Sequence, residues 1–302
     1  MKRLIVLAAV ILLYIPCNGQ KDGFVNSADN SKIYYRTYGK GKPMLIINGG
    51  PGMNSDGFVS LAMQLSGKYQ TIIFDQRGTG KSTVDKPDST NITMALMAED
   101  MELLRKHLNI STWIILGHSF GGMLASYYAT IYPDKIDALI LSSSGGIDMD
   151  ILNMAGNSIN SKLSKMELDS VNYWNDKINN GDTSYSAKLQ RGTFLAAAYV
   201  YDRKNIPVIA KRLTQSNALV GGLVWDDMTR INFDCSLKLS SFDKPVLIIQ
   251  GKEDIVNEGM ALKAHKAFKN SKLVYMDRCV HYGWLDRPDL YFAEIDKFLQ
   301  SK

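Results

Sequence analysis

The sequence predicts an α/β protein with a mostly parallel central sheet, helices on both faces and an inserted helical cap. Short apolar runs recur along the chain, and helix-like segments separate most of them, which is typical of parallel strands buried on both faces. This rhythm is interrupted once, between residues 148 and 236. The apolar runs lie at residues 44–47, 71–74, 113–116, 138–141, 246–249 and 273–276.

Periodicity predicts the elements around these runs. Residues 24–27 and 33–38 alternate apolar and polar side chains around a turn at 29–31, which predicts an antiparallel pair of strands. Apolar side chains recur at helical spacing in three further segments of the core. The predicted helices cover residues 93–108, 258–268 and 289–299.

We interpret the interruption as an inserted helical cap. It has no clear strand pattern and contains helical patterns at residues 161–179, 186–200 and 207–214. The predicted core is therefore residues 20–147 and 237–302, and the predicted cap is residues 148–236. An insertion beyond the carboxyl end of a strand covers the crevice where open α/β sheets bind ligands, so we expect the cap to shape the substrate pocket.

Residues 1–19 have the features of a signal peptide. Lys2 and Arg3 give a positive start, residues 4–15 are apolar, and a small-residue cleavage site ends near Gly19. The apolar stretch is shorter than the roughly 20 residues that span a bilayer, which disfavours a membrane anchor. Lipid attachment at Cys17 is the third alternative. We expect an exported protein, periplasmic or secreted, without further membrane contact.

Composition excludes several classes of protein. Of 302 residues, 45% are hydrophobic and 22% charged, so the chain is neither disordered nor fibrous. Its net charge of +5 falls to +3 once the two positive charges of the signal peptide are removed. No basic cluster interleaved with aromatics occurs, so we expect no nucleic-acid partner. Spacing leaves open whether Cys235 and Cys279 pair, and the oligomeric state is also open.

The segment Gly117-His118-Ser119-Phe120-Gly121 connects an apolar run to a helix-like segment. A serine raised on a sharp strand-to-helix turn needs glycines two positions before and after it, because strand and helix approach closely there. The five-residue pattern alone is weakly specific, and its context gives it value. We therefore predict that Ser119 is a nucleophile.

A serine hydroxyl needs a base within hydrogen-bond reach and a third group that orients the base. Among the four histidines, only His281 follows the last predicted strand in a loop; the others are His107, His265 and His118, and we expect His118 to point to the other side of the turn. Asp254 lies just beyond a buried strand and is the predicted orienting acid. Glu253 is its near competitor and Asp148 its remote one.

A tetrahedral intermediate also needs donors for its oxyanion. The backbone N–H of Phe120, directly after the nucleophile, is one candidate. The other lies in the loop Asn48-Gly49-Gly50-Pro51-Gly52, where Gly50 is in the expected position. The chemistry assembled in this way requires neither a metal nor a cofactor.

Together these residues resemble the α/β-hydrolase fold, in which the order along the chain is serine, acid, histidine. More narrowly, the chain resembles the proline iminopeptidase family of serine aminopeptidases. The segment Asn48-Gly49-Gly50-Pro51-Gly52 is similar to that family's His-Gly-Gly-Pro-Gly, and residues 75–82 contain its Asp-Gln-Arg-Gly segment. The resemblance covers residues 24–147 and 236–300. Asn48 replaces the usual histidine, and Gly-His-Ser-Phe-Gly replaces the usual Gly-Gly-Ser-Trp-Gly elbow.

The resemblance implies an exported serine aminopeptidase that releases an N-terminal residue, often proline, from small peptides. In this family cap carboxylates hold the substrate's ammonium group. The candidates here are Glu167, Asp202, Asp226 and Asp227. An esterase or other small-acyl hydrolase is the alternative, since many esterases and carbon–carbon bond hydrolases share the elbow found here. A non-catalytic ligand-binding protein on the same fold is a second alternative.

Overall fold

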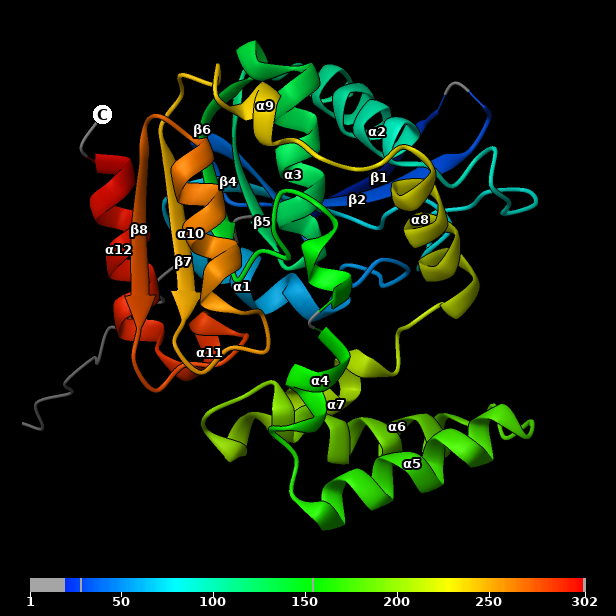
Figure 1. The fold of residues 1–302 in the computed structure, drawn as a ribbon. Helices are drawn as coiled ribbons and strands as arrows, with labels where there is room; N and C mark the ends of the chain where they lie inside the picture. The colour runs from blue at the N-terminus through cyan, green and yellow to red at the C-terminus, as the bar shows by residue number, and fades with distance from the viewer. Residues whose placement is uncertain (1–19, 28, 154, 301–302) are drawn as a thin grey trace, which may run out of the picture.

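A computed structural model describes residues 20–27, 29–153 and 155–300, and these form an eight-stranded sheet with helices on both sides (Figure 1). Its strand order is β1-β2-β4-β3-β5-β6-β7-β8. The pairs β1–β2 and β2–β4 are antiparallel and the remaining pairs are parallel. The predicted mostly parallel sheet is therefore confirmed, as is its antiparallel N-terminal pair. The strands are β1 (Lys21–Asn26), β2 (Lys32–Tyr38), β3 (Lys42–Ile47), β4 (Tyr69–Phe74), β5 (Trp113–His118), β6 (Ile136–Ser142), β7 (Val246–Gly251) and β8 (Ser271–Met276).

The helices alternate with the strands in the core, and between β6 and β7 the described residues form helices and no strand. The core helices are α1 (Val59–Leu65), α2 (Met94–His107), α3 (Phe120–Ile131), α9 (Ser236–Leu239), α10 (Glu258–Ala267), α11 (Gly283–Asp286) and α12 (Pro288–Gln300). Between β6 and β7 the structure also has α4 (Ala155–Asn160), α5 (Lys165–Asn179), α6 (Tyr185–Leu195), α7 (Ile206–Leu213) and α8 (Ala218–Arg230). Short 3₁₀ helices are η1 (Asp56–Phe58), η2 (Pro133–Lys135), η3 (Met149–Asn153), η4 (Ala196–Ala198) and η5 (Arg203–Asn205).

Alternation along the strands produces two cores, one on each face of the sheet. In β3, Leu45 and Ile47 face one apolar cluster, whereas Met44 and Ile46 face the other. The first cluster is covered by α2, α3, α8 and α10, and the second by α1, α11 and α12. Because successive side chains of a strand point to opposite faces, a strand covered on both sides is apolar at every position, as the sequence pattern indicated.

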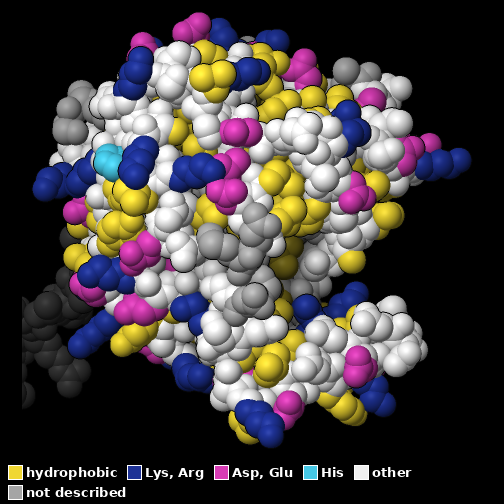
Figure 2. Space-filling model, in the orientation of Figure 1, with side chains coloured by type: hydrophobic (Ala, Val, Ile, Leu, Met, Phe, Trp, Pro, Cys, Tyr) yellow, Lys and Arg dark blue, Asp and Glu magenta, His cyan; other side chains and the backbone are white. Residues whose placement is uncertain are grey.

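Helices α4 to α7 lie beyond the carboxyl ends of the strands (Figure 1). In Figure 2 this lobe stands below the core, and the surface is hollowed between them on the right of the view. A groove there is lined by residues of α5, α6 and the α7–α8 connection, Asn175, Arg191 and Asn217 among them.

Helix α8 behaves differently from its neighbours in sequence. Its Val220, Val224 and Met228 belong to the same apolar cluster as α2 and α3, so it packs on the core. The sequence did not suggest this helix, because Gly221 and Gly222 lower helix propensity in its middle. A Cβ at Gly221 would lie 2.9 Å from the carbonyl oxygen of Pro51, which explains the glycine.

The predicted signal peptide, residues 1–19, lies outside the described residues. Within the described part, no helix combines the length and the apolar character needed to cross a membrane.

Candidate active site

Ser119 occupies a sharp turn between β5 and α3. Its backbone has φ 55° and ψ −123°, a combination that residues other than glycine rarely adopt. A Cβ at Gly117 would lie 2.4 Å from the carbonyl oxygen of Gly121, and one at Gly121 would lie 2.2 Å from that of Ile47. The steric reason for both glycines is therefore confirmed.

Hydrogen bonds from neighbouring strand ends hold this turn. The N–H of Ser119 donates to the carbonyl of Ser142 at 3.1 Å, at the end of β6. The carbonyl of Ser119 accepts from the N–H groups of Gly122 and Gly145 at 2.9 and 3.0 Å. These bonds fix the strained conformation and leave the half-buried side chain facing a cavity.

His281 and Asp254 form a buried pair. The Nδ1 atom of His281 lies 2.8 Å from Oδ1 of Asp254, and the two residues are 2% and 7% exposed. A carboxylate can only accept, so Nδ1 carries the proton of the neutral ring and Nε2 is free to accept one. Asp254 is itself held by the N–H of Val256 at 3.1 Å and Nε2 of Gln250 at 3.0 Å.

The two competing acids, Glu253 and Asp148, form hydrogen bonds and ion pairs with other residues. Glu253 accepts hydrogen bonds from the backbone N–H groups of Arg278 and Cys279, and Asp148 forms an ion pair with Lys263. The structure thus places Asp254, rather than Glu253 or Asp148, beside His281.

The remaining core histidines also have other partners. The ring of His107 lies 3.1 Å from the hydroxyl of Tyr35, and that of His265 lies 2.8 Å from the hydroxyl of Ser271. Neither residue lines the cavity at Ser119.

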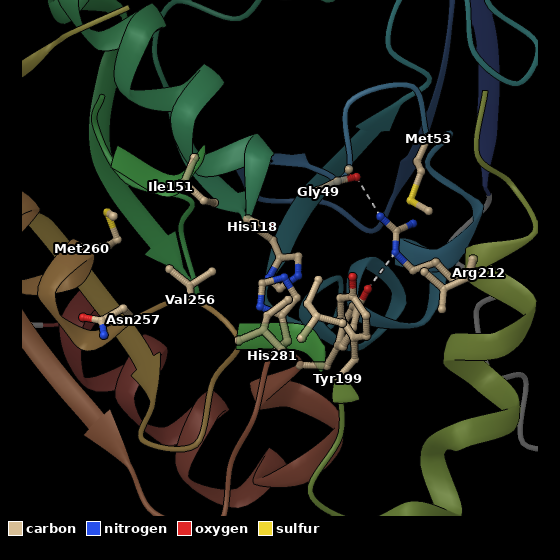
Figure 3. Close-up of a pocket in the computed structure, with 16 residues that line it drawn as sticks. Gly49, Met53, His118, Ile151, Tyr199, Arg212, Val256, Asn257, Met260 and His281 are labelled. Atoms are coloured by element: carbon tan, nitrogen blue, oxygen red, sulfur yellow. Dashed lines mark hydrogen bonds between the residues drawn. The ribbon is translucent and has the colours of Figure 1, made fainter. Parts of the chain in front are cut away.

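His118 does not point away from the site as the sequence suggested. It lines the same cavity as Ser119, and its ring centroid is 4.6 Å from that of His281 (Figure 3). β5 continues through His118, so its side chain falls on the face packed against Tyr282 and Trp284, with centroids 5.0 and 4.9 Å away. Burial, with His281 and Arg212 nearby, holds the pKa of His118 well below its usual range. In the described residues no carboxylate contacts the ring of His118, whereas Asp254 contacts that of His281.

The two predicted oxyanion donors, Gly50 and Phe120, both lie near Ser119. Gly50 lines the cavity and has φ +70°, a conformation that favours glycine. Phe120 is the first residue of α3, where N–H groups have no partner within the helix. Its ring is buried and stacks edge-on with Trp225.

The cavity at Ser119 has a volume of about 190 Å³. Side chains from the core loops and from the region between β6 and β7 line it together, and most are apolar (Figure 3). Ile151, Tyr199 and Leu213 come from that region, and Val256 and Met260 from the core. A space of this size accepts a small substrate.

None of the four predicted cap acids lines this cavity. Glu167 lies in the first turn of α5 and pairs with Arg203, whereas Asp202 pairs with Lys204 at the surface. Asp227 accepts from the N–H of Met94 at the start of α2 and also pairs with Arg230. Asp226 is exposed. A role for these acids in binding an amine stays a prediction.

Arg212 is a site residue that the sequence did not reveal. It is 3% exposed and lines the cavity from the last turn of α7. Nη2 donates to the carbonyl of Gly49 at 2.8 Å, and Nε donates to the hydroxyl of Tyr282 at 3.1 Å. Its partners are distant along the chain, and Lys and Arg in a helix usually face solvent, so no local pattern identifies it.

The Asp-Gln-Arg-Gly segment after β4 forms hydrogen bonds with the loop beside Ser119. Nε2 of Gln76 donates to the carbonyl of Asn48 at 2.9 Å, which anchors the glycine loop. Asp75 accepts from the backbone N–H groups of Ser55 and Lys81. These contacts give the segment a structural role next to the oxyanion loop.

No group of three or more His, Cys, Asp or Glu side chains capable of holding a metal ion occurs in the described residues. Cys235 and Cys279 are both free and buried. Burial raises the pKa of the Cys235 thiol to about 12, which makes it a poor nucleophile.

A family model described as the alpha/beta hydrolase fold matches residues 42–288. This chain belongs to the α/β-hydrolase fold family. Its sequence also resembles proline iminopeptidases: that of Saccharolobus solfataricus is 27% identical over 284 residues, which are 89% of each chain. A putative proline iminopeptidase of Mycoplasma genitalium is 33% identical over 187 residues, 56% of this α/β hydrolase and 60% of that protein. The present chain thus aligns with less than two thirds of the Mycoplasma protein.

A solved structure supports the same fold. An α/β fold family hydrolase from Bacillus anthracis superposes with a TM-score of 0.74 at 18% identity, covering 92% of this α/β hydrolase and 99% of that chain. At this identity the likeness concerns the fold alone.

Proposed function

We propose that this α/β hydrolase is a serine hydrolase that cleaves its substrate through an acyl-enzyme on Ser119. The observation that carries the proposal is the buried His281–Asp254 pair, which opens onto the same cavity as Ser119. A nucleophile, a base and an orienting acid in this arrangement perform acyl transfer on several unrelated folds.

The proposed reaction begins when the hydroxyl of Ser119 attacks the substrate carbonyl and its proton passes to Nε2 of His281. Asp254 stabilises the imidazolium that forms, and the ring then gives the proton to the leaving group. The N–H groups of Gly50 and Phe120 bind the oxyanion. A water molecule then attacks the carbonyl of the acyl-enzyme and gives its proton to Nε2 of His281. The ring returns the proton to the oxygen of Ser119 as the acyl group leaves.

As the substrate we propose a small peptide from which the N-terminal residue is removed. Support comes from the relatives named proline iminopeptidases, one of which matches over 89% of both chains. The cavity volume of about 190 Å³ is consistent with a single residue or short acyl group.

The second candidate is an esterase or other small-acyl hydrolase. One observation favours it: the four cap acids lie away from the cavity, and the acid beside it, Asp254, is paired with His281. A substrate ammonium would find no free carboxylate among the described cavity-lining residues, whereas a neutral ester needs none.

The test compares the purified protein and Ser119→Ala on proline p-nitroanilide and on p-nitrophenyl acetate. We expect the variant to lose at least about 10³-fold in kcat/KM on whichever substrate is cleaved. Turnover of the anilide supports the aminopeptidase, and ester turnover without anilide turnover supports the esterase. If Ser119→Ala leaves both activities unchanged, the proposed acyl-enzyme is wrong and the chain is better regarded as a ligand-binding homologue.

A further inference from the structure

Arg212 is a buried cation at the edge of the cavity whose contacts are not carboxylates. In the described part of the chain its guanidinium contacts the carbonyl of Gly49, the hydroxyl of Tyr282 and the face of Phe58, 4.7 Å from the ring centroid. Burying a charge costs free energy unless the charge is paired and hydrogen-bonded. Arg212 is hydrogen-bonded to a carbonyl and a hydroxyl and is not paired with an acid.

The carbonyl that Arg212 contacts belongs to the peptide unit that carries the Gly50 N–H. The oxygen of Gly49 accepts from Nη2 of Arg212 at 2.8 Å and from Nδ2 of Asn48 at 3.1 Å. The described part of the chain has no cis peptide bond, and in a trans unit the C=O and the N–H point in opposite directions. Two donors on the oxygen therefore also fix the direction of the N–H on the other side.

This peptide unit lies directly against the nucleophile. A Cβ at Gly49 would be 2.7 Å from Cβ of Ser119 and 2.9 Å from the carbonyl oxygen of His118. Within the described residues the Gly50 N–H makes no hydrogen bond, so it remains available to a ligand. An available donor beside Ser119, held from behind by a cation, has the features of a preorganised oxyanion site.

We propose that Arg212 is a positioning residue that aligns and polarises the Gly49–Gly50 peptide, so that the Gly50 N–H becomes a stronger oxyanion donor. This inference rests on the proposed function. A hydrogen bond to an amide oxygen strengthens the N–H of the same unit by about 10–30%, and a charged donor is about twice as strong as a neutral one. Asn48, the second donor to the Gly49 carbonyl, is neutral.

The segment that contributes Arg212 also holds the glycine loop at a second point. The N–H of Asn217, just before α8, donates to the carbonyl of Gly52 at 2.8 Å. Through Tyr282, which follows the base His281, the same guanidinium touches the other side of the site. The region between β6 and β7 therefore completes the catalytic geometry in addition to lining the pocket.

A direct anion-binding role for Arg212 is the competing explanation. Nη1 of Arg212 is buried and has no hydrogen-bond partner among the described residues. A Cβ at Gly57 would lie 2.8 Å from it, so Nη1 is packed against the backbone of η1. Nη2 and Nε bind Gly49 and Tyr282, which both line the cavity, so the nitrogen packed against η1 is poorly placed to receive a substrate carboxylate (Figure 3).

The experiment measures kcat and KM of full-length Arg212→Met and Arg212→Lys on two esters. One ester, p-nitrophenyl acetate, is neutral, and the other, mono-p-nitrophenyl succinate, carries a carboxylate on its acyl group. For Arg212→Met we expect kcat to fall about tenfold to a hundredfold on both esters, less than the ~10²–10³ lost when an oxyanion donor is removed. KM should change less than about threefold, and Arg212→Lys should recover part of kcat because it keeps a cationic donor.

Arg191→Met is the matched control. Arg191 is a half-buried arginine of α6 that does not line the cavity at Ser119, so its replacement should leave both parameters unchanged. A melting temperature for each variant separates positioning from unfolding. If Arg212→Met fails to fold, the kcat of Arg212→Lys decides the question.

Two results would overturn the inference. One is an unchanged kcat in a folded Arg212→Met or, where that variant does not fold, in Arg212→Lys. The other is a loss confined to the KM of the succinate ester, which would assign Arg212 to anion binding. Failure of the proposed function is recognised separately, because Ser119→Ala would then retain turnover whatever Arg212 does.

Discussion

Ser119 holds a backbone conformation, φ 55° and ψ −123°, that is costly for any side chain. Strain of this kind amounts to about 1–3 kcal/mol and persists where the surroundings enforce it. Here the bonds to Ser142, Gly122 and Gly145 do so. The geometry that exposes the hydroxyl therefore reduces the stability of the fold.

We expect Ser119→Gly to abolish hydrolysis and to raise the melting temperature. Glycine adopts this conformation freely, and the relief exceeds the roughly 0.5–1 kcal/mol that its extra freedom costs in the unfolded chain. A gain of about 1 kcal/mol corresponds to about 2–4 °C in a domain of this size. Ser119→Ala is the control, because it removes the nucleophile and keeps the strain. A glycine variant that melts below the alanine variant would contradict the argument.

The positions of some site residues could be predicted from the sequence, and those of others could not. Ser119, His281 and Asp254 could be placed because each follows a recognisable strand, and strand ends of a parallel sheet meet at one edge. His118 could not, since its orientation depends on how far β5 extends before the turn. Arg212 contacts Gly49 across 163 positions in sequence, a distance at which no local pattern carries information.

At the scale of elements, α5 begins with a charged capping arrangement. The Ser164 side chain accepts from the N–H of Glu167, the Glu167 carboxylate accepts from the N–H of Ser164, and Glu167 also pairs with Arg203, the first residue of η5. The Arg203 hydrogen bond, together with those from Ser164, lowers the pKa of Glu167 from 4.5 to about 2. A carboxyl whose pKa is lower in the folded state stabilises the fold above its unfolded pKa, and this contribution disappears as the pH falls toward 2.

Glu167→Gln should therefore destabilise the protein at pH 7 and flatten its acid-unfolding profile between about pH 5 and pH 2. Arg203 is 61% exposed, so solvent screening limits the effect to about 1 kcal/mol. Urea unfolding at pH 7 and at pH 3 measures both values. A destabilisation equally large at both pH values would show that the charge is not responsible.

The loop after β4 is held by a buried ion pair. Arg77 is fully buried and donates from Nε and Nη2 to the two oxygens of Asp100 on α2, each at 2.8 Å. Arg77→Met should cost about 3–5 kcal/mol, because it leaves the buried Asp100 without the cation that pairs with it. The double variant Arg77→Met/Asp100→Leu should recover much of that loss in urea unfolding. If it is no more stable than the single variant, the other contacts of Arg77, with Asp29 and Asn91, dominate.

At the scale of the whole molecule, alternating apolar runs and helices were enough to predict the layers, because burial on both faces leaves its mark in sequence. The strand order was not predictable in the same way. In the structure β3 lies between β4 and β5, an arrangement that depends on crossover connections rather than on the composition of a strand. Helix α8 was not predicted, because Gly221 and Gly222 lower the helix propensity of its sequence.

Export remains a prediction that depends on residues 1–19. We expect the full-length chain, expressed in a Gram-negative host, to appear in the periplasm about 19 residues shorter than its gene predicts, as the positive start and apolar stretch require. N-terminal sequencing of the periplasmic product measures the cleavage position. A chain lacking residues 2–19 is the control and should stay in the cytoplasm. Recovery of the uncleaved full-length chain from the membrane fraction would instead support an anchor.

The bond between Arg212 and Gly49 joins the region between β6 and β7 to the loop that lies against Ser119. By the role proposed for Arg212, we expect an insertion transplanted between β6 and β7 without a suitably placed arginine to leave Ser119, His281 and Asp254 in position and still to lower kcat. A chimaera designed on this scaffold should therefore carry over the end of α7 together with the glycine loop it supports.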